Sequence, residues 1–239
     1  RKTLGKTISF LKKSNVVGLP TETVYGLAGN AYSKSSVKKI FNLKGRPKNN
    51  PIIIHYYDFN DAKKDIEINE NFLRLYKKFC PGPITFILRK KNYSKIHSLA
   101  LAKLKTVAVR FPNNTIARTI LKKINFPLAM PSANKSTNLS PVRAEDVFDE
   151  FKKKVQLIID GGKSKIGIES TVVDLTSEPV ILRPGIVNKN SIEKTLKMKL
   201  KSNLKIKKIK SPGTSKKHYS PGIPVKINQM KNDKKSAFI

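Results

Sequence analysis

Short apolar runs that end in polar residues constrain the fold of this chain more than any other feature. Each run is long enough for a strand and too short for a core helix, and polar or glycine-proline residues close it. We therefore predict strands over residues 15–19, 51–56, 84–88, 106–111, 127–130, 156–160, 171–175 and 180–182. No run reaches the roughly 18 apolar residues of a membrane-spanning helix, so we expect none.

Between these runs, apolar residues recur at helical spacing, as Leu4, Ile8 and Leu11 do. The same pattern predicts helices over residues 35–44, 71–79, 115–124 and 144–151, and a final helix and strand within 189–210. Strands and helices alternate irregularly, and the last strands adjoin like hairpins. The sequence therefore predicts an α/β fold, α+β-like, with a sheet of mixed direction and not a uniform βαβ array.

The charge of the chain points to anionic ligands without identifying them. Lys and Arg number 49 against 16 Asp and Glu, a formal net charge of +33. Such a chain attracts polyanions such as nucleotides, RNA or an anionic membrane surface. Most of the excess is lysine scattered along the whole sequence, which is equally typical of a compositional bias. Arginine is scarcer, and its planar fork suits phosphate and carboxylate, so each Arg is the better indicator of a site.

Cysteine and histidine usage argues against a metal centre. Cys80 is the single cysteine, so an internal disulfide and a cysteine-rich zinc site are excluded, and we interpret it as a buried apolar side chain. The three histidines include no pair at metal-ligand spacing, so we predict no protein-bound metal. No signal peptide is visible, and we expect a cytoplasmic protein without membrane association.

Polar residues gather where the predicted strands end. The first strand leads into Thr21, Glu22, Thr23 and Tyr25. The loop of residues 44–51 places three cations around a glycine and a proline, followed by two asparagines. Such a loop suits either a phosphate clamp or a solvated basic turn, and the residues favour the two equally.

Other candidates lie at or near strand ends and are mostly residues that bind and orient. They are His55, Arg110, Ser132, Asn134, Ser170 and Arg183. His55 suits a half-buried position or a pocket contact, and Arg110 needs either a ligand carboxylate or a structural acid. Apart from histidine, side chains of these types are poor general acids and bases. The pattern favours a reaction whose nucleophile belongs to the substrate, with the protein supplying positioning and charge neutralisation.

Together these segments resemble the YrdC-like family of L-threonylcarbamoyladenylate synthases. The matching segments, within residues 15–186, are LPTETVYGLAGNA, KGRPKNNPIIIH, TVAVRFP, MPSANKST, GIESTVVDL and ILRPG. The resemblance implies a twisted mixed sheet flanked by helices around a large basic cavity. SPGTSKKHYSPGIPV is similar to the linker of the longer form of the family. It implies a catalytic domain over 1–209, a lid-forming linker over 210–225 and the start of a truncated second domain over 226–239.

The resemblance also implies a reaction. L-threonine and bicarbonate form a carbamate that attacks the α-phosphorus of ATP, giving threonylcarbamoyl-AMP and pyrophosphate. A tRNA threonylcarbamoyl transferase machinery would then use the product to modify tRNA. Mg²⁺ would enter with ATP, held by phosphates and water.

The resemblance assigns roles to individual residues. Lys44 and Arg46 would be catalytic. Substrate threonine would contact Thr23, His55, Arg110, Ser132 and Ser170. The nucleotide would contact Arg46, Asn50, Thr106, Asn134, Ser140, Arg183 and, from the linker, Tyr219.

Two other functions remain open from the sequence. A module that grips double-stranded RNA or tRNA by its backbone fits the charge, although the chain has no Trp and no RNA-binding aromatic motif. A related carbamoyl-transfer domain acting in metal-cofactor maturation fits the same segments, but the chain lacks paired cysteines.

Overall fold

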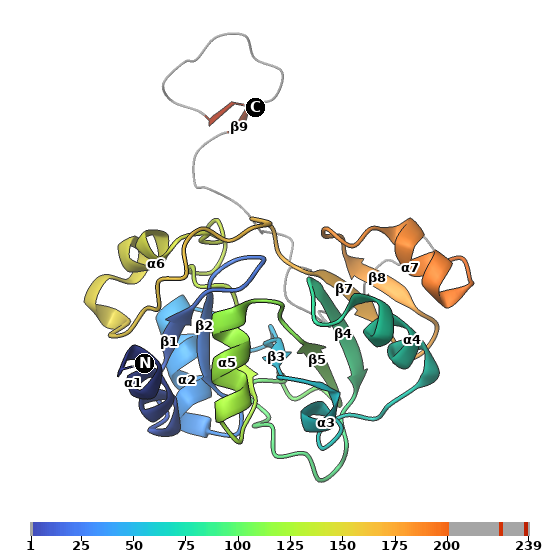
Figure 1. The fold of residues 1–239 in the computed structure, drawn as a ribbon, viewed down its shortest axis with the longest axis horizontal. Coiled ribbons are helices and arrows are strands. Elements are labelled where there is room, and N and C mark those ends of the chain that lie inside the picture. The colour runs from blue at the N-terminus through green and yellow to red at the C-terminus, as the bar shows by residue number, and fades with distance from the viewer. Residues whose placement is uncertain (1, 201–224, 227–236, 239) are drawn as a thin grey trace.

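An eight-stranded sheet forms the centre of the molecule in a computed structural model, which describes residues 2–200, 225–226 and 237–238 (Figure 1). The strand order is β1-β2-β6-β3-β5-β4-β7-β8. The strands are β1 (Val17–Leu19), β2 (Gly26–Asn30), β3 (Ile54–His55), β4 (Ile84–Arg89), β5 (Thr106–Arg110), β6 (Leu128–Ala129), β7 (Thr171–Asp174) and β8 (Val180–Arg183). β3 and β5 are parallel, as are β4 and β7, and the other neighbours are antiparallel. The predicted mixed sheet is confirmed.

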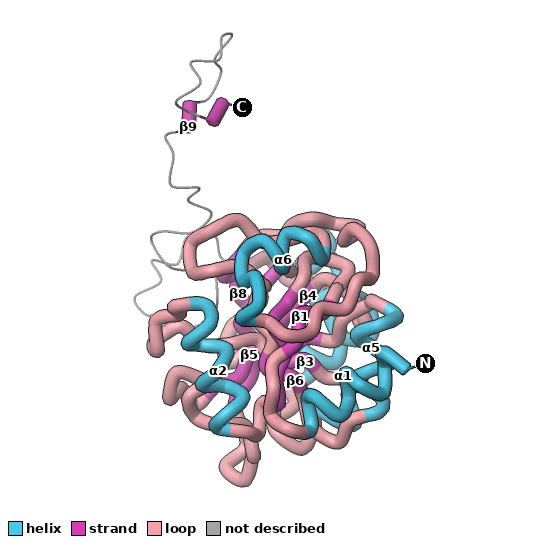
Figure 2. The backbone as a smooth tube through the Cα atoms, turned by 90° about the vertical axis from the view of Figure 1, so that its left-hand side faces the viewer, coloured by secondary structure: helices cyan, strands magenta, loops and turns pink. Residues whose placement is uncertain are grey.

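Helices cover both sides of the sheet, with α2 on one side and α1 and α5 on the other (Figure 2). The helices are α1 (Lys2–Lys12), α2 (Lys34–Lys44), α3 (Phe59–Ala62), α4 (Glu70–Phe79), α5 (Thr115–Lys123), α6 (Ala144–Phe151), the 3-10 turn η1 (Lys152–Lys154) and α7 (Lys189–Leu196). Side chains of Ser33, Asn69 and Asn114 accept backbone N–H groups at the starts of α2, α4 and α5. These caps fix where the helices begin.

The core is divided between the two sides of the sheet. Val37 and Ile40 of α2 belong to the larger cluster, and Leu11 of α1 and Ile120 of α5 belong to the smaller one. Ile52 and Ile54 are fully buried in the larger cluster, whereas the alternate residues Ile53 and His55 face a cavity. Alternation along an extended segment therefore anchors it by one face and offers the other to a ligand.

The structure corrects two of the predicted strands and contains two elements that were not predicted. Residues 156–160 do not form a strand, since only Ile158 makes a single bridge, to Gly18. Residues 51–56 are extended in part, and only Ile54–His55 pairs as a strand. β2 and the short helix α3 were missed, because the glycine- and alanine-rich sequence GLAGN carries little strand signal.

Residues 210–224 of the predicted linker lid, including Tyr219, lie outside the described residues, and the predicted domain boundaries stay predictions. Near the C-terminal end, β9 (Val225–Lys226) pairs in parallel with β10 (Ala237–Phe238). Within the described part of the chain, no helix has the length and apolarity needed to cross a membrane.

Candidate functional site

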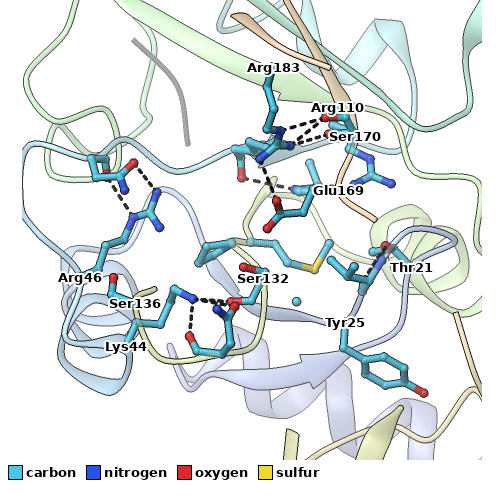
Figure 3. A pocket seen from close by; sticks show the side chains of 18 of the residues that line it. Thr21, Tyr25, Lys44, Arg46, Arg110, Ser132, Ser136, Glu169, Ser170 and Arg183 are labelled. Carbon is cyan, nitrogen blue, oxygen red and sulfur yellow. Dashed lines mark hydrogen bonds and ion pairs between the residues drawn. The ribbon is translucent and has the colours of Figure 1, made fainter. Parts of the chain in front are cut away.

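A cavity of about 280 Å³ opens where the ends of several strands and loops converge (Figure 3). Four cations and one carboxylate line it, together with threonines, serines, asparagines and a small apolar wall. The cations are Lys44, Arg46, Arg110 and Arg183, and the carboxylate is Glu169. Positive charge therefore exceeds negative charge in the lining, which favours an anionic ligand.

Lys44 is the last residue of α2 and points into the loop that follows β6. Gly45 ends the helix in the left-handed conformation, with φ 59°. The buried Nζ atom donates to the carbonyl oxygens of Ser132 and Asn134 and lies 3.4 Å from Asn134 Oδ1. Burial, and then the charge of Arg46, lower the pKa of Lys44 well below 10.5. Lys44 thus ties the end of α2 to this loop.

Arg46 is fixed by its own loop. Its Nε donates to the Asn50 carbonyl at 3.0 Å, and Nη2 donates to Asn50 Oδ1 at 2.7 Å and to the Pro51 carbonyl at 2.6 Å. No described residue accepts from Nη1. Burial lowers the pKa of Arg46 to about 10; Glu169 opposes this shift and Arg183 adds to it. The guanidinium is therefore charged at neutral pH and has donors left for a ligand.

Arg110 ends β5 and forms a buried ion pair. Its Nη2 lies 2.7 Å from Glu22 Oε1, and the two side chains are 5% and 8% exposed. Glu22 Oε2 also accepts the Asn113 backbone N–H at 3.0 Å. Arg110 Nε is buried and has no partner among the described residues. The sequence left open whether Arg110 pairs with a structural acid or with a ligand carboxylate. The structure shows a structural acid, Glu22, and leaves one Arg110 donor unused.

Arg183 ends β8 and wraps around Ser170. Its Nε and Nη2 donate to the Ser170 carbonyl at 3.0 and 2.9 Å, and Nη2 donates to Ser170 Oγ at 3.1 Å. Its Nη1 lies 3.4 Å from Glu169 Oε2, while Glu169 Oε1 accepts from Ser140 Oγ at 2.8 Å. Burial lowers the pKa of Arg183, and Glu169 counteracts the shift. Arg183, Glu169 and Ser170 together form one wall of the cavity (Figure 3). Ser140 bonds to Glu169 from outside the lining.

His55 faces the cavity from β3 as a neutral ring. It is 2% exposed, and Nδ1 lies 3.3 Å from the Ile53 carbonyl. Burial, followed by the positive charge of Arg110, lowers the pKa of His55 well below 6.5. At neutral pH the side chain therefore presents neutral hydrogen-bonding groups to the cavity.

The loop after β1 turns on the Thr21 hydroxyl. Thr21 Oγ1 lies 2.8 Å from Thr23 Oγ1 and accepts the backbone N–H groups of Thr23 and Val24. Tyr25 OH donates to the Gly162 carbonyl and accepts the Gly161 N–H. Thr21 and Tyr25 line the cavity, whereas Thr23 is buried behind Thr21. The polar residues of this loop therefore serve both its fold and the cavity surface.

The cavity brings together most of the residues singled out from the sequence. Those in its lining are Lys44, Arg46, Asn50, His55, Arg110, Ser132, Asn134, Ser170 and Arg183. Thr23 and Ser140 lie one side chain behind the lining, bonded to Thr21 and Glu169. Thr106 begins β5, at the end opposite Arg110, and is not in the lining. The roles proposed for all of these residues stay predictions.

Sequence reasoning missed several lining residues. Glu169, Met130 and Ser136 were not assigned, although each directly flanks or lies within a segment that was singled out. Glu22 was noted only as part of a polar cluster, and its pairing with Arg110 spans 88 positions. The pairing of a buried carboxylate with a buried arginine would have identified Glu22, but no local sequence pattern reveals such a pair.

A match to a protein-family model shows which family the chain belongs to. The Sua5/YciO/YrdC family model, described as "Telomere recombination", matches residues 9–185. The chain belongs to this family. The resemblance inferred from the sequence motifs is confirmed.

Other members of the Sua5/YciO/YrdC family match along nearly the whole chain. A Pyrococcus abyssi protein named threonylcarbamoyl-AMP synthase is 40% identical and is matched over 94% of this chain and 67% of its own length. A Bacillus subtilis protein of the same name is 37% identical, with shares of 94% and 66%. The crystal structure of P. abyssi Sua5 complexed with L-threonine superposes with a TM-score of 0.89 at 39% identity, covering 97% of this chain and 69% of that one. The chain spans about two thirds of the length of these relatives.

Proposed function

We propose that this chain carries L-threonylcarbamoyladenylate synthase activity, forming threonylcarbamoyl-AMP and pyrophosphate from L-threonine, bicarbonate and ATP. The observation that carries the proposal is the convergence of Lys44, Arg46, Arg110 and Arg183 on one cavity in which Glu169 is the carboxylate among the described lining residues. The substrates bring a triphosphate and a carboxylate, which require such an excess of positive charge. Family membership and relatives named threonylcarbamoyl-AMP synthase support the same activity.

The proposed reaction is a nucleotidyl transfer with the nucleophile on the substrate. The carbamate oxygen forms a bond to the α-phosphorus of ATP, and the bond from that phosphorus to the bridging oxygen breaks, releasing pyrophosphate. Negative charge builds on the leaving group. Arg46, with donors left on Nη1, is placed to take up this charge, and Lys44 keeps the opposing loop in position.

The amino-acid end of the cavity is assigned to Arg110, His55 and Ser132. Arg110 retains a buried donor without a partner, which suits a carboxylate. The apolar side chains of Val24, Ile53 and Met130 in the same lining suit the methyl group of threonine. The proposed site thus matches both the charged and the apolar parts of the amino acid.

Mg²⁺ enters this proposal as part of the ATP substrate. Glu169, the carboxylate of the described lining, already pairs with Arg183 and accepts from Ser140. Phosphate oxygens and water are therefore the expected ligands, and the ion offsets charge on the phosphates. A tRNA-modifying transferase machinery is the proposed consumer of the product, and the cytoplasm the proposed location.

Pyrophosphate release from ATP and bicarbonate, with and without L-threonine, tests the proposal. We expect release that depends on threonine, at least a 10-fold loss in Arg46→Ala, and little change in Lys48→Ala, an exposed cation of the same loop. Calorimetric binding of both ligands without release would indicate that residues outside this chain are needed. Binding of neither ligand, together with steeply salt-dependent binding of double-stranded RNA, would replace the proposal with the RNA-binding one.

A further inference from the structure

Arg110 and Arg183, the buried arginines of the described lining, each form an ion pair with a carboxylate, and the two carboxylates differ in position. Glu169, the partner of Arg183, is part of the cavity surface. Glu22, the partner of Arg110, is 7% exposed and contributes nothing to that surface. The Glu22 carboxylate reaches the described lining through its contact with Arg110.

We propose that Glu22 is the positioning residue that holds Arg110 for the carboxylate of the amino-acid substrate. The inference rests on the proposed function, since it takes Arg110 as the contact for that carboxylate. It assigns Glu22 a role in affinity for one substrate and not merely in folding.

Glu22 is itself held at several points, which a positioning group requires. Its Oε2 accepts from the Asn113 backbone, and its own carbonyl accepts the Ile166 N–H at 2.9 Å. The neighbouring Thr23 carbonyl accepts the Gly167 N–H at 2.9 Å. The carboxylate is thus held by the chain after β5, and the backbone that carries it is held by Ile166 and Gly167, which restricts how far the carboxylate can follow a moving guanidinium.

The contact leaves Arg110 with capacity for a ligand. Glu22 binds Nη2, Nε has no partner, and no described residue accepts from Nη1. Because Glu22 holds the guanidinium through one nitrogen, the orientation of the group is restrained and its other N–H groups can donate to a ligand. Without Glu22, the buried side chain would lose both its orientation and its counter-charge.

Binding of L-threonine and of L-threoninol, which lacks the carboxylate, separates this role from a structural one. Calorimetry on the chain gives both affinities, with ATP affinity measured beside them. We expect Glu22→Ala to weaken threonine binding about 10-fold or more, and to change threoninol and ATP binding by less than about 3-fold. Glu22→Gln offers one acceptor in place of two, so its threonine affinity should lie between those of the wild type and Glu22→Ala.

A matched control is Asp65→Asn. Asp65 is a buried carboxylate that accepts from Tyr32, Tyr56 and Ser94, away from the cavity lining. This variant should lower thermal stability and leave the ratio of threonine to threoninol affinity unchanged.

The outcomes are distinct. Glu22→Ala that stays folded and binds threonine as the wild type does, or that weakens both amino-acid ligands equally, would overturn the positioning role while the proposed function stands. A wild-type chain that binds no threonine would overturn the proposed function itself.

Discussion

The Nζ atom of Lys44 lies 2.6 Å from the carbonyl oxygen of Ser132, so the last residue of α2 is tied to the loop after β6. The contact is reciprocal, because the Ser136 N–H donates to the Lys44 carbonyl at 2.9 Å. Two polar clusters that are separate in the sequence therefore form one unit. The charge at one side of the cavity and the shape of the opposing loop depend on the same side chain.

Lys44→Met tests this dependence. The substitution keeps an unbranched side chain but removes the donor to the buried oxygens of Ser132 and Asn134. Losing a donor to buried acceptors costs about 1–3 kcal/mol of unfolding free energy, and the loop should shift with it. The urea concentration at the unfolding midpoint and the rate of pyrophosphate release should both fall.

Lys38→Met on the exposed face of α2 is the control, and it should stay within about 0.5 kcal/mol of the wild type. If Lys44→Met unfolded at the same urea concentration as Lys38→Met, the loop would be held by other contacts.

The sequence indicates which residues meet in the cavity better than it indicates how they are held. Polar residues at strand ends lie close together because the strand ends meet at one edge of the sheet. On this basis Arg110, Ser170 and Arg183 could be expected in one site from the sequence. The partner Glu22 escaped assignment, because its ion pair with Arg110 spans 88 positions and depends on the strand order. Glu169 pairs with Arg183 across only 14 positions and adjoins Ser170, yet it too was not assigned. Strand order is fixed by long-range packing and not by any local pattern.

Gly185→Ala and Gly5→Ala should change stability in opposite directions. A Cβ at Gly185 would lie 2.5 Å from the Thr171 backbone N and 2.8 Å from the Glu169 carbonyl oxygen. Backbone atoms cannot yield cheaply, so we expect a loss of about 1–3 kcal/mol and a displaced Glu169–Ser170 wall. Gly5 lies inside α1 with nothing within 4 Å of a Cβ. Alanine there should add about 0.5–1 kcal/mol.

The melting temperature and the affinity for ATP, measured separately for each variant, test this prediction. Gly5→Ala should raise the melting temperature at unchanged ATP affinity, whereas Gly185→Ala should lower both quantities. An undisturbed Gly185→Ala variant would mean that the contact between residue 185 and the start of β7 relaxes without consequence.

The missed elements have a physical reason as well. β2 lies between β1 and β6, where its small residues allow close packing, and a Cβ on Gly29 would lie 2.3 Å from Ser36 Oγ. Tertiary packing, and not local sequence preference, determines that this segment forms a strand. Residues 156–160 show the opposite case, since their apolar side chains fill the core although only Ile158 makes a bridge.

Tyr25→Phe should separate the two tasks of this side chain. The hydroxyl bridges Gly161 and Gly162, and the residue also lines the cavity. Removing the hydroxyl should cost about 1 kcal/mol of unfolding free energy and leave threonine and ATP affinity within about 2-fold. Tyr93→Phe, at a side chain 72% exposed, is the neutral control for urea unfolding. A large loss of ligand affinity in Tyr25→Phe would instead place the hydroxyl at the ligand.

His55 gives the fold a pH dependence whose sign follows from its burial. Burial first, and the charge of Arg110 second, lower its pKa in the folded state well below 6.5. The unfolded chain takes up this proton near pH 6.5 while the folded chain does not. The contribution of neutral His55 is therefore fully present above pH 6.5 and is lost as the pH falls toward the folded-state pKa, by up to about 1.4 kcal/mol per pH unit.

Urea unfolding at pH 7.5 and pH 5.0, for the wild type and for His55→Asn, measures this contribution. Asparagine does not titrate, so the stability difference between the two pH values should shrink by about 1–2 kcal/mol in the variant. Comparing each protein with itself removes any constant cost of the substitution. Equal losses in both proteins would show that His55 takes up its proton in the folded state, and Arg110 would then share its end of the cavity with a second cation at acidic pH.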